Sequence, residues 1–207
     1  MDFIQSAFSL FHKGGLVMYP LALCSMFVAA IIAERYWFFR AETGDAAALR
    51  RELSPALAAG DWDKALAVCG GVNGSAAAVA YAGLERRSRD PQVVEKAMEA
   101  AASLKAAKLR DRLQYLDFVV TLSPLLGLLG TVVGMIQSFS IMNISEGQPF
   151  AITGGVGEAL IATASGLCVA IFALIAHAYF ARQLDKLVTD MEETAYCLLN
   201  EIRGESR

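Results

Sequence analysis

The sequence predicts an all-α integral membrane protein with three transmembrane helices and long cytoplasmic helical extensions. Hydrophobic residues make up 56% of the 207 residues and charged residues only 19%, and the mean hydropathy is +0.44. These values lie outside the usual range for a soluble domain. Three stretches lack Asp, Glu, Lys and Arg altogether, namely residues 14–33, 118–145 and 159–181. Each reaches the roughly 20 residues that a helix needs to cross about 30 Å of hydrocarbon.

The N-terminal part of the chain predicts one surface helix and one span. Residues 1–13 carry apolar side chains at helical spacing, which is typical of a short amphipathic helix in the membrane interface. The first transmembrane helix is expected at 14–39, where aromatic residues at 36–39 form an interfacial belt. The sequence around Ala33 is not a small-residue processing site, so this span is interpreted as a retained anchor.

The distribution of Lys and Arg predicts the topology. Of 18 basic residues, one precedes the first span, thirteen lie between Arg35 and Arg112, none separates spans two and three, and four follow span three. By the positive-inside rule, residues 40–112 and 182–207 are cytoplasmic, whereas the N-terminus and the 141–153 loop lie outside.

The segment 40–112 is predicted to be a cytoplasmic helical domain, with breaks at two glycine-containing turns and at Asp90. Asp61 is a candidate N-cap for a helix over 62–69, and Asp90 with Pro91 at the first helical position begins a longer helix. We expect that longer helix to run without a break into the second transmembrane helix, because no helix breaker follows until the second span is well under way.

The second and third transmembrane helices are expected at 113–140 and 154–181, the third continuing as a cytoplasmic C-terminal helix over 182–207. Apolar residues keep the 3.6-residue period beyond the membrane, at positions 184, 187, 188, 191, 195, 198 and 199. Two helices of about 45 to 50 residues are therefore predicted, and their cytoplasmic apolar stripes need partners.

Glu158 is the candidate for chemistry, because no other strongly ionisable residue lies between Glu146 and Arg182. A charge at the centre of a spanning helix costs about 2.5 to 3.5 kcal/mol on insertion scales, and such residues usually face a bundle interior or a water-filled path. Glu158 is interpreted as a proton acceptor or relay. The alternative is a helix-end residue near the headgroups, since the neighbouring glycines leave the helix start open.

Small residues are frequent in spans two and three, and they predict close helix packing, either within one copy of the chain or between copies. The residues singled out for packing are Gly127, Gly130, Gly134, Ala162 and Gly166. Hydroxyl groups at Thr131 and Thr163, among others, could order water, although each commonly bonds its own helix. At 100° per residue Thr163 lies about 140° from Glu158, so these two side chains are expected to face different neighbours.

Several functions are disfavoured by what the sequence lacks. Neither the four cysteines nor the two isolated histidines have metal-ligand spacing, and no cofactor motif stands in a credible context. An enzyme is not expected, because no nucleophile and base pair is recognisable. A small-molecule transporter is disfavoured by the lack of an inverted repeat.

Residues 124–136 (PLLGLLGTVVGMI) and 157–167 (GEALIATASGL) resemble the two hallmark stretches of the MotA/TolQ/ExbB proton channel family. Residues 14–20 and 33–38 resemble the first span of its ExbB and TolQ branch, so the resemblance covers nearly the whole chain. Three spans disfavour the flagellar stator branch, whose members typically have four.

The resemblance implies a homo-pentamer in the bacterial inner membrane, with its N-terminus periplasmic and a central pore lined by spans two and three. The pore would hold transmembrane helices of a dimeric ExbD- or TolR-type single-span partner, and a TonB- or TolA-type energy transducer would act with them. Proton flow through such a complex energises outer-membrane processes. An ExbB-like transport function, a TolQ-like function in outer-membrane maintenance and a non-conducting scaffold remain as alternatives.

By motif match, the family's pore-facing threonines fall on Thr131 and Thr163 and its glutamate on Glu158, whereas the proton-carrying aspartate belongs to the partner. Phe172 stands where ExbB-type members commonly have proline, which favours a straighter third helix. His177 is interpreted either as a proton-exit group or as an interfacial residue packed against the first span.

Overall fold

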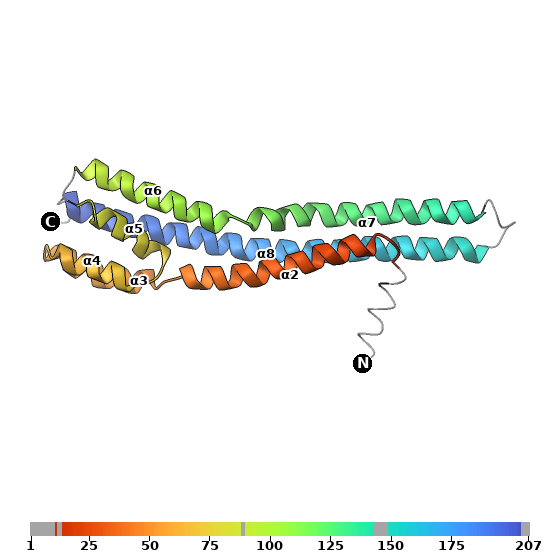
Figure 1. The fold of residues 1–207 in the computed structure, drawn as a ribbon, viewed down its shortest axis with the longest axis horizontal. Helices are drawn as coiled ribbons and strands as arrows, with labels where there is room; N and C mark the ends of the chain where they lie inside the picture. The colour runs from red at the N-terminus through yellow and green to blue at the C-terminus, as the bar shows by residue number, and fades with distance from the viewer. Residues whose placement is uncertain (1–10, 12–13, 88–89, 143–148, 204–207) are drawn as a thin grey trace, which may run out of the picture. The chain divides into compact units, whose positions relative to one another are not determined.

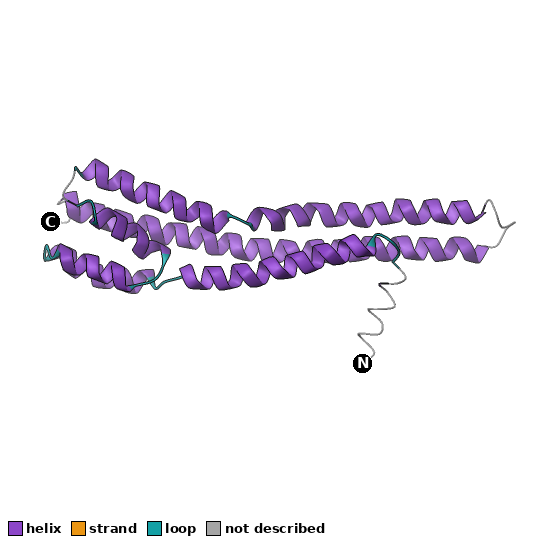
Figure 2. Cartoon of the chain, viewed as in Figure 1, coloured by secondary structure: helices purple, strands orange, loops and turns teal. Residues whose placement is uncertain are grey.

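The structure, a computed structural model, describes residues 11, 14–87, 90–142 and 149–203. Almost all of the predicted amphipathic helix at 1–13, and residues 143–148 of the predicted loop, lie outside these residues. The described elements are α2 (Met18–Glu42), α3 (Ala46–Ala58), α4 (Trp62–Gly71), α5 (Ser75–Leu84), α6 (Pro91–Arg110), α7 (Leu113–Met142) and α8 (Pro149–Arg203) (Figure 1). Within the described residues every regular element is a helix, which confirms the predicted all-α class (Figure 2).

The chain divides into two compact units. The span unit comprises Met1–Ala33 and Arg112–Ala178, and the polar unit comprises Glu34–Asp111 and Tyr179–Arg207. Three described helical stretches are long and apolar enough to cross a membrane, within Met18–Ala58, Pro91–Ser140 and Gly154–Arg203. Their number agrees with the predicted three spans.

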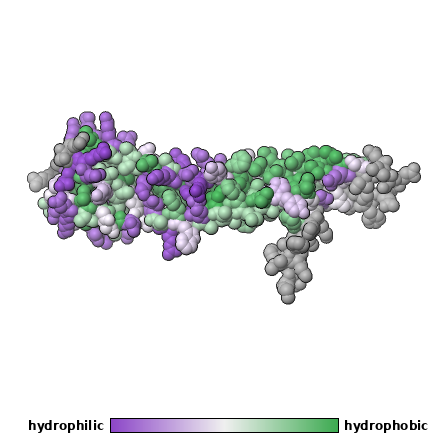
Figure 3. Space-filling view, viewed as in Figure 1, coloured by the Kyte–Doolittle hydropathy of each residue, from purple (hydrophilic) through white to green (hydrophobic). Residues whose placement is uncertain are grey.

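The two units differ in surface character. On the face seen in Figure 3, the span unit is covered mainly by hydrophobic residues. Large apolar side chains are exposed on it, including Phe118, Leu128 and Ile175, which are 60%, 57% and 62% exposed. The polar unit carries patches of hydrophilic residues on the same view. Such a continuous apolar surface is characteristic of a protein that meets lipid or other copies of a membrane protein.

The polar unit has a core of its own, built from small and medium apolar residues of α3 to α6 and the C-terminal part of α8. Leu53, Val79, Val94 and Leu198 are fully buried in it, and Met191 is 1% exposed. The predicted apolar stripe of α8 supplies the last two of these residues. The stripe therefore finds its partners within the same chain, in the helices that precede the second span.

Helix boundaries in the polar unit follow the predicted caps. The Asp61 carboxylate accepts a hydrogen bond from the Lys64 N–H at 3.1 Å, and the Asp90 carboxylate accepts one from the Gln92 N–H at 3.0 Å. Both predicted N-caps are confirmed. Each satisfies a backbone donor that the first turn of a helix otherwise leaves without a partner.

A partly buried ion pair and a hydroxyl group join three helices of the polar unit. The Lys105 ammonium donates to both carboxylate oxygens of Glu42 at 2.9 Å, and the Ser75 hydroxyl donates to the same carboxylate at 2.8 Å. Burial raises the pKa of Glu42, but the hydrogen bonds from Lys105 and Ser75 and the charges of Lys105 and Lys108 lower it by more. The net result is a pKa below the ordinary value of 4.5.

The prediction of one unbroken helix from Gln92 into the second span is wrong. Helix α6 ends at Arg110, α7 begins at Leu113, and Arg112 has a left-handed φ of 64° between them. A left-handed residue other than glycine costs about 1 kcal/mol. An arginine distant in sequence favours the break, as described next.

Arg35, at the C-terminal end of the first span, is only 3% exposed and binds the end of α6. Its Nη1 donates to the Asp111 carbonyl at 2.9 Å and lies 3.5 Å from the Leu109 carbonyl, while its Nη2 contacts the Glu34 carboxylate at 3.1 Å. The guanidinium thus satisfies carbonyls at the end of α6 where positive charge is favoured. Local sequence patterns around residue 111 contain no trace of this contact.

Helix α8 is a single helix of 55 residues. At 1.5 Å per residue it is about 80 Å long, far more than the about 30 Å of a hydrocarbon core. The prediction that the third apolar stretch continues as one helix into the C-terminal segment is confirmed as far as Arg203. The helix begins at Pro149, so Gly154, Gly155 and Gly157 lie inside it rather than before it.

Candidate functional site

The candidate site lies in the span unit, where α7 and α8 pack along a seam of small residues. A Cβ added to Gly127 would lie 3.0 Å from the Thr163 Cα, and one added to Gly134 would lie 3.0 Å from the Gly155 carbonyl oxygen. A Cβ added to Gly130 would overlap the Cβ of Ala162. The two backbones are therefore as close as glycine and alanine allow.

The seam extends toward both ends of this contact. A Cβ added to Gly166 would lie 2.5 Å from the Ser123 carbonyl oxygen, and one added to Gly155 would overlap the Ser138 hydroxyl. All five residues predicted to mediate packing thus lie at the α7–α8 contact within one chain.

The hydroxyl groups of the seam are engaged in different ways. Thr131 donates to the Leu128 carbonyl of its own helix at 2.6 Å, as expected for a helical threonine. Thr163 instead donates across the seam to the Gly127 carbonyl of α7 at 3.0 Å. Ser123 is fully buried, and its Oγ has no hydrogen-bond partner among the described residues.

Glu158 occupies a different position from the threonines. It is half-buried, and its carboxyl group lies against Gly15, the residue three positions before α2 begins. Because Thr163 faces α7 and Glu158 faces the segment before α2, the expectation that the two face different neighbours is confirmed. The three predicted site residues do not form one contiguous cluster within a single chain.

The two threonines, by contrast, flank one point of the seam. Thr131 follows Gly130 and Thr163 follows Ala162, and these two small residues meet. In the span unit, the arrangement offers the Glu158 carboxyl group and several hydroxyl oxygens, among them those of Thr131 and Thr163, in largely apolar surroundings. Such a set can exchange and relay protons but offers neither an activated nucleophile nor a metal-binding cluster in the described part of the chain.

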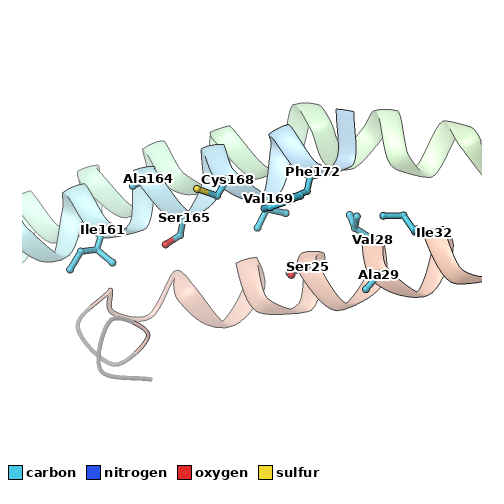
Figure 4. Close-up of a pocket in the computed structure, with 10 residues that line it drawn as sticks. All are labelled: Ser25, Val28, Ala29, Ile32, Ile161, Ala164, Ser165, Cys168, Val169 and Phe172. Atoms are coloured by element: carbon cyan, nitrogen blue, oxygen red, sulfur yellow. The ribbon is translucent and has the colours of Figure 1, made fainter. Parts of the chain in front are cut away.

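A groove of about 620 Å³ lies between α2 and α8 in the span unit (Figure 4). Its walls are mainly apolar, and Ser25, Ser165 and Cys168 are its polar lining groups. Glu158 does not line it. His177 is half-buried on α8 and does not line the groove either.

Sequence reasoning gave no role to Gly15, although it lies in one of the stretches on which the family resemblance rests. Its φ of +71° and its contact with Glu158 distinguish it from Gly14, whose backbone is not left-handed. The paired glycines just before an apolar span were the available signal. They could not reveal which residue, about 140 positions later, the second glycine would contact.

The fold and the site define a multi-span α-helical membrane protein with an ionisable side chain in its span unit. The chain belongs to the MotA/TolQ/ExbB proton channel family, whose sequence model matches residues 72–193. Its relatives place it in the ExbB and TolQ branch of that family.

Three curated relatives illustrate the similarity. The chain is 39% identical over 171 residues to the putative biopolymer transport protein ExbB-like 1 of Synechocystis sp., covering 80% of this chain and 66% of that protein. It is 28% identical over 198 residues to the biopolymer transport protein exbB1 of Vibrio cholerae, covering 92% and 86%. It is 38% identical over 96 residues to the Tol-Pal system protein TolQ of Pseudomonas aeruginosa, covering 46% and 42%. The chain therefore spans slightly less than two thirds of the first relative and less than half of the third.

Proposed function

We propose that the chain is the proton-channel subunit of an inner-membrane motor complex, driven by the proton-motive force, that energises outer-membrane transport. The observation that carries this proposal is a carboxyl group, Glu158, in a span unit whose α7–α8 seam also holds Thr131 and Thr163. An ionisable residue in a membrane helix usually serves function, because its insertion is costly. The biopolymer-transport names of the relatives support the same reading.

In this proposal the chain forms a homo-pentamer, and α7 and α8 line a central pore. The uncovered apolar side chains of α7, such as Leu125, Val132 and Ile136, support an arrangement in which other membrane helices cover them. A dimer of an ExbD- or TolR-type single-span protein occupies the pore and contributes the proton-carrying aspartate. A TonB- or TolA-type protein then transmits the energy.

The proposed orientation places the polar unit and the C-terminus in the cytoplasm and the N-terminus in the periplasm. The concentration of basic residues between Arg35 and Arg112 supports it. Within the pore, Thr131 and Thr163 line the constriction, and Glu158 sets the field and hydration nearby. The small residues Gly127, Gly130, Gly134, Ala162 and Gly166 hold α7 and α8 together.

A TolQ-like role in outer-membrane maintenance is the second candidate, favoured by the 38% identity to a TolQ protein over 96 residues. Co-purification separates the two candidates. The chain is expressed in turn with an ExbD-type and a TolR-type partner from its own source, and the partner that remains bound through detergent sizing identifies the pathway. Equal retention of both would contradict a dedicated role.

Proton flux into liposomes that contain the chain and its bound partner tests the conduction role. We expect Glu158→Ala to abolish flux while membrane insertion and oligomer size stay unchanged, because the seam does not include this carboxyl. Glu192→Ala, which removes an exposed carboxylate of the polar unit, is the control and should keep full flux. Normal flux in Glu158→Ala would refute the role of Glu158, and no flux in the wild-type complex would favour a non-conducting scaffold.

A further inference from the structure

The Glu158 side chain fills the space beside Gly15 in which any other residue would place its Cβ. A Cβ added to Gly15 would overlap the Glu158 Oε1, and it would lie 2.7 Å from Cδ and 3.2 Å from Cγ. The whole end of the Glu158 side chain therefore rests on the face of Gly15 where any other residue would place its side chain.

The backbone at Gly15 is fixed in a conformation that glycine alone adopts without strain. Its φ is +71°, and its carbonyl accepts a hydrogen bond from the Met18 N–H at 3.2 Å as α2 begins. The Gly14 N–H donates to the Phe11 carbonyl at 3.4 Å on the other side. The turn is thus held by its own hydrogen bonds on both sides of Gly15.

The same turn packs on both helices of the seam. A Cβ added to Gly14 would lie 3.1 Å from the Ile161 Cγ2 of α8, and the Val17 Cβ lies 3.6 Å from the position of a Cβ on Gly130 of α7. Val17 is 6% exposed. Because the turn contacts α7 and α8 on either side, it cannot retreat from Glu158 without losing these contacts.

We propose that Gly15 is a positioning residue for Glu158: its missing side chain and left-handed backbone form the surface that sets where the Glu158 carboxyl group lies. This role rests on the proposed function, since it matters for conduction only if Glu158 acts there. The first span then contributes to the proton pathway without lining it. Nothing at residue 15 itself binds or transfers a proton.

Gly15→Ala is the direct test, and Gly60→Ala is its matched control. Gly60 also has a left-handed φ, of +69°, but no atom lies within 4 Å of an added Cβ. The control therefore measures only the cost of placing alanine in a left-handed backbone conformation, without steric overlap. Two readouts are taken on the complex with its partner: proton flux, and the infrared carboxyl band that disappears in Glu158→Gln. A merely structural role of Gly15 would leave that band in place.

We expect Gly15→Ala to shift the Glu158 band and to reduce proton flux about tenfold or more, since optimised sites lose up to about 100-fold when a group is displaced by about 1 Å. Gly60→Ala should change neither. Glu158→Asp shortens the side chain by one methylene, so adding it to Gly15→Ala should restore the yield of inserted complex if that yield is reduced.

Each outcome decides the proposal. An unshifted band overturns it, whether flux is lost or kept, and so does a Gly15→Ala yield that Glu158→Asp fails to recover. A shifted band with normal flux in Glu158→Gln upholds the positioning role and refutes the proposed function of Glu158. A shifted band in Gly15→Ala, together with reduced flux in both Gly15→Ala and Glu158→Gln, supports the positioning role and the proposed function.

Discussion

The α7–α8 seam makes a quantitative prediction at Gly130. In Gly130→Ala the new methyl group would overlap the Cβ of Ala162. Both groups are attached directly to helix backbones, so no side-chain rotation can relieve the overlap and the helices must separate. Separation would also loosen the contacts at Gly127 and Gly134, where an added Cβ would lie only 3.0 Å from the nearest atom of α8.

The expected cost follows from two opposing terms. Overpacking of a tightly packed site costs about 1–3 kcal/mol. Replacement of a helical glycine by alanine gains up to about 1 kcal/mol of helix propensity. Gly157→Ala isolates the second term, because Gly157 is also helical but has no atom within 4 Å of an added Cβ. The difference in unfolding free energy between the two variants should therefore be about 1–3 kcal/mol.

The measurement is reversible unfolding of the detergent-solubilised protein, with the exchange variant Gly130→Ala plus Ala162→Gly as the decisive comparison. The exchange keeps the composition and moves the methyl group from one helix to the other, so it should restore stability to near the wild-type value. If Gly130→Ala is as stable as Gly157→Ala, or if the exchange restores no stability, the contact between Gly130 and Ala162 does not set how closely α7 and α8 approach.

Two further predictions concern the polar unit. Because the pKa of Glu42 is lowered by Lys105, the stability that this pair contributes is complete above about pH 4.5 and is lost as the pH falls through the lowered pKa. The midpoint temperature of thermal unfolding should therefore fall less steeply between about pH 6 and pH 3 in Glu42→Gln than in the wild type. Parallel profiles of the two proteins would contradict the stabilising role of the ion pair. Arg35→Lys should lower the unfolding free energy by about 1–3 kcal/mol, because one ammonium cannot replace the planar guanidinium at the carbonyls that end α6. Arg40→Lys, at an exposed position of the same helix, should leave the unfolding free energy unchanged. An equal effect of both substitutions would contradict the role of Arg35 at the end of α6.

The parts of the fold that follow local rules could be predicted from the sequence. Charge-free stretches of sufficient length indicate spans, and Asp61 and Asp90 precede helices because their carboxylates satisfy first-turn donors. The apolar stripe that includes Leu198 predicts burial because its period matches the helix. In each case the predictive signal lies in residues close together in sequence, even though the partners that bury the stripe lie in helices before the second span.

The features that could not be predicted depend on pairs of residues far apart in sequence. The break after α6 involves Arg35, which lies 76 positions before Asp111. The seating of Glu158 depends on Gly15, and neither residue by itself indicates the other. The seam lies between these cases: small residues predict a close approach, but only the fold assigns that approach to helices of the same chain.

The hydrogen bonds of the two threonines restrict what they can offer to a proton pathway. Thr131 donates its only proton to the Leu128 carbonyl, and Thr163 donates its only proton to the Gly127 carbonyl. What remains on each hydroxyl is acceptor capacity alone. If the two line a pore as proposed, the groups opposite them must be donors, such as water, hydronium or a protonated carboxyl group. A pore lined by acceptors stabilises a proton in transit and a protonated carrier, and it disfavours a bare carboxylate at the same level. The partner's acidic residue would therefore pass the threonines in its neutral form, which is the form in which a carboxyl group crosses apolar surroundings at the lowest cost.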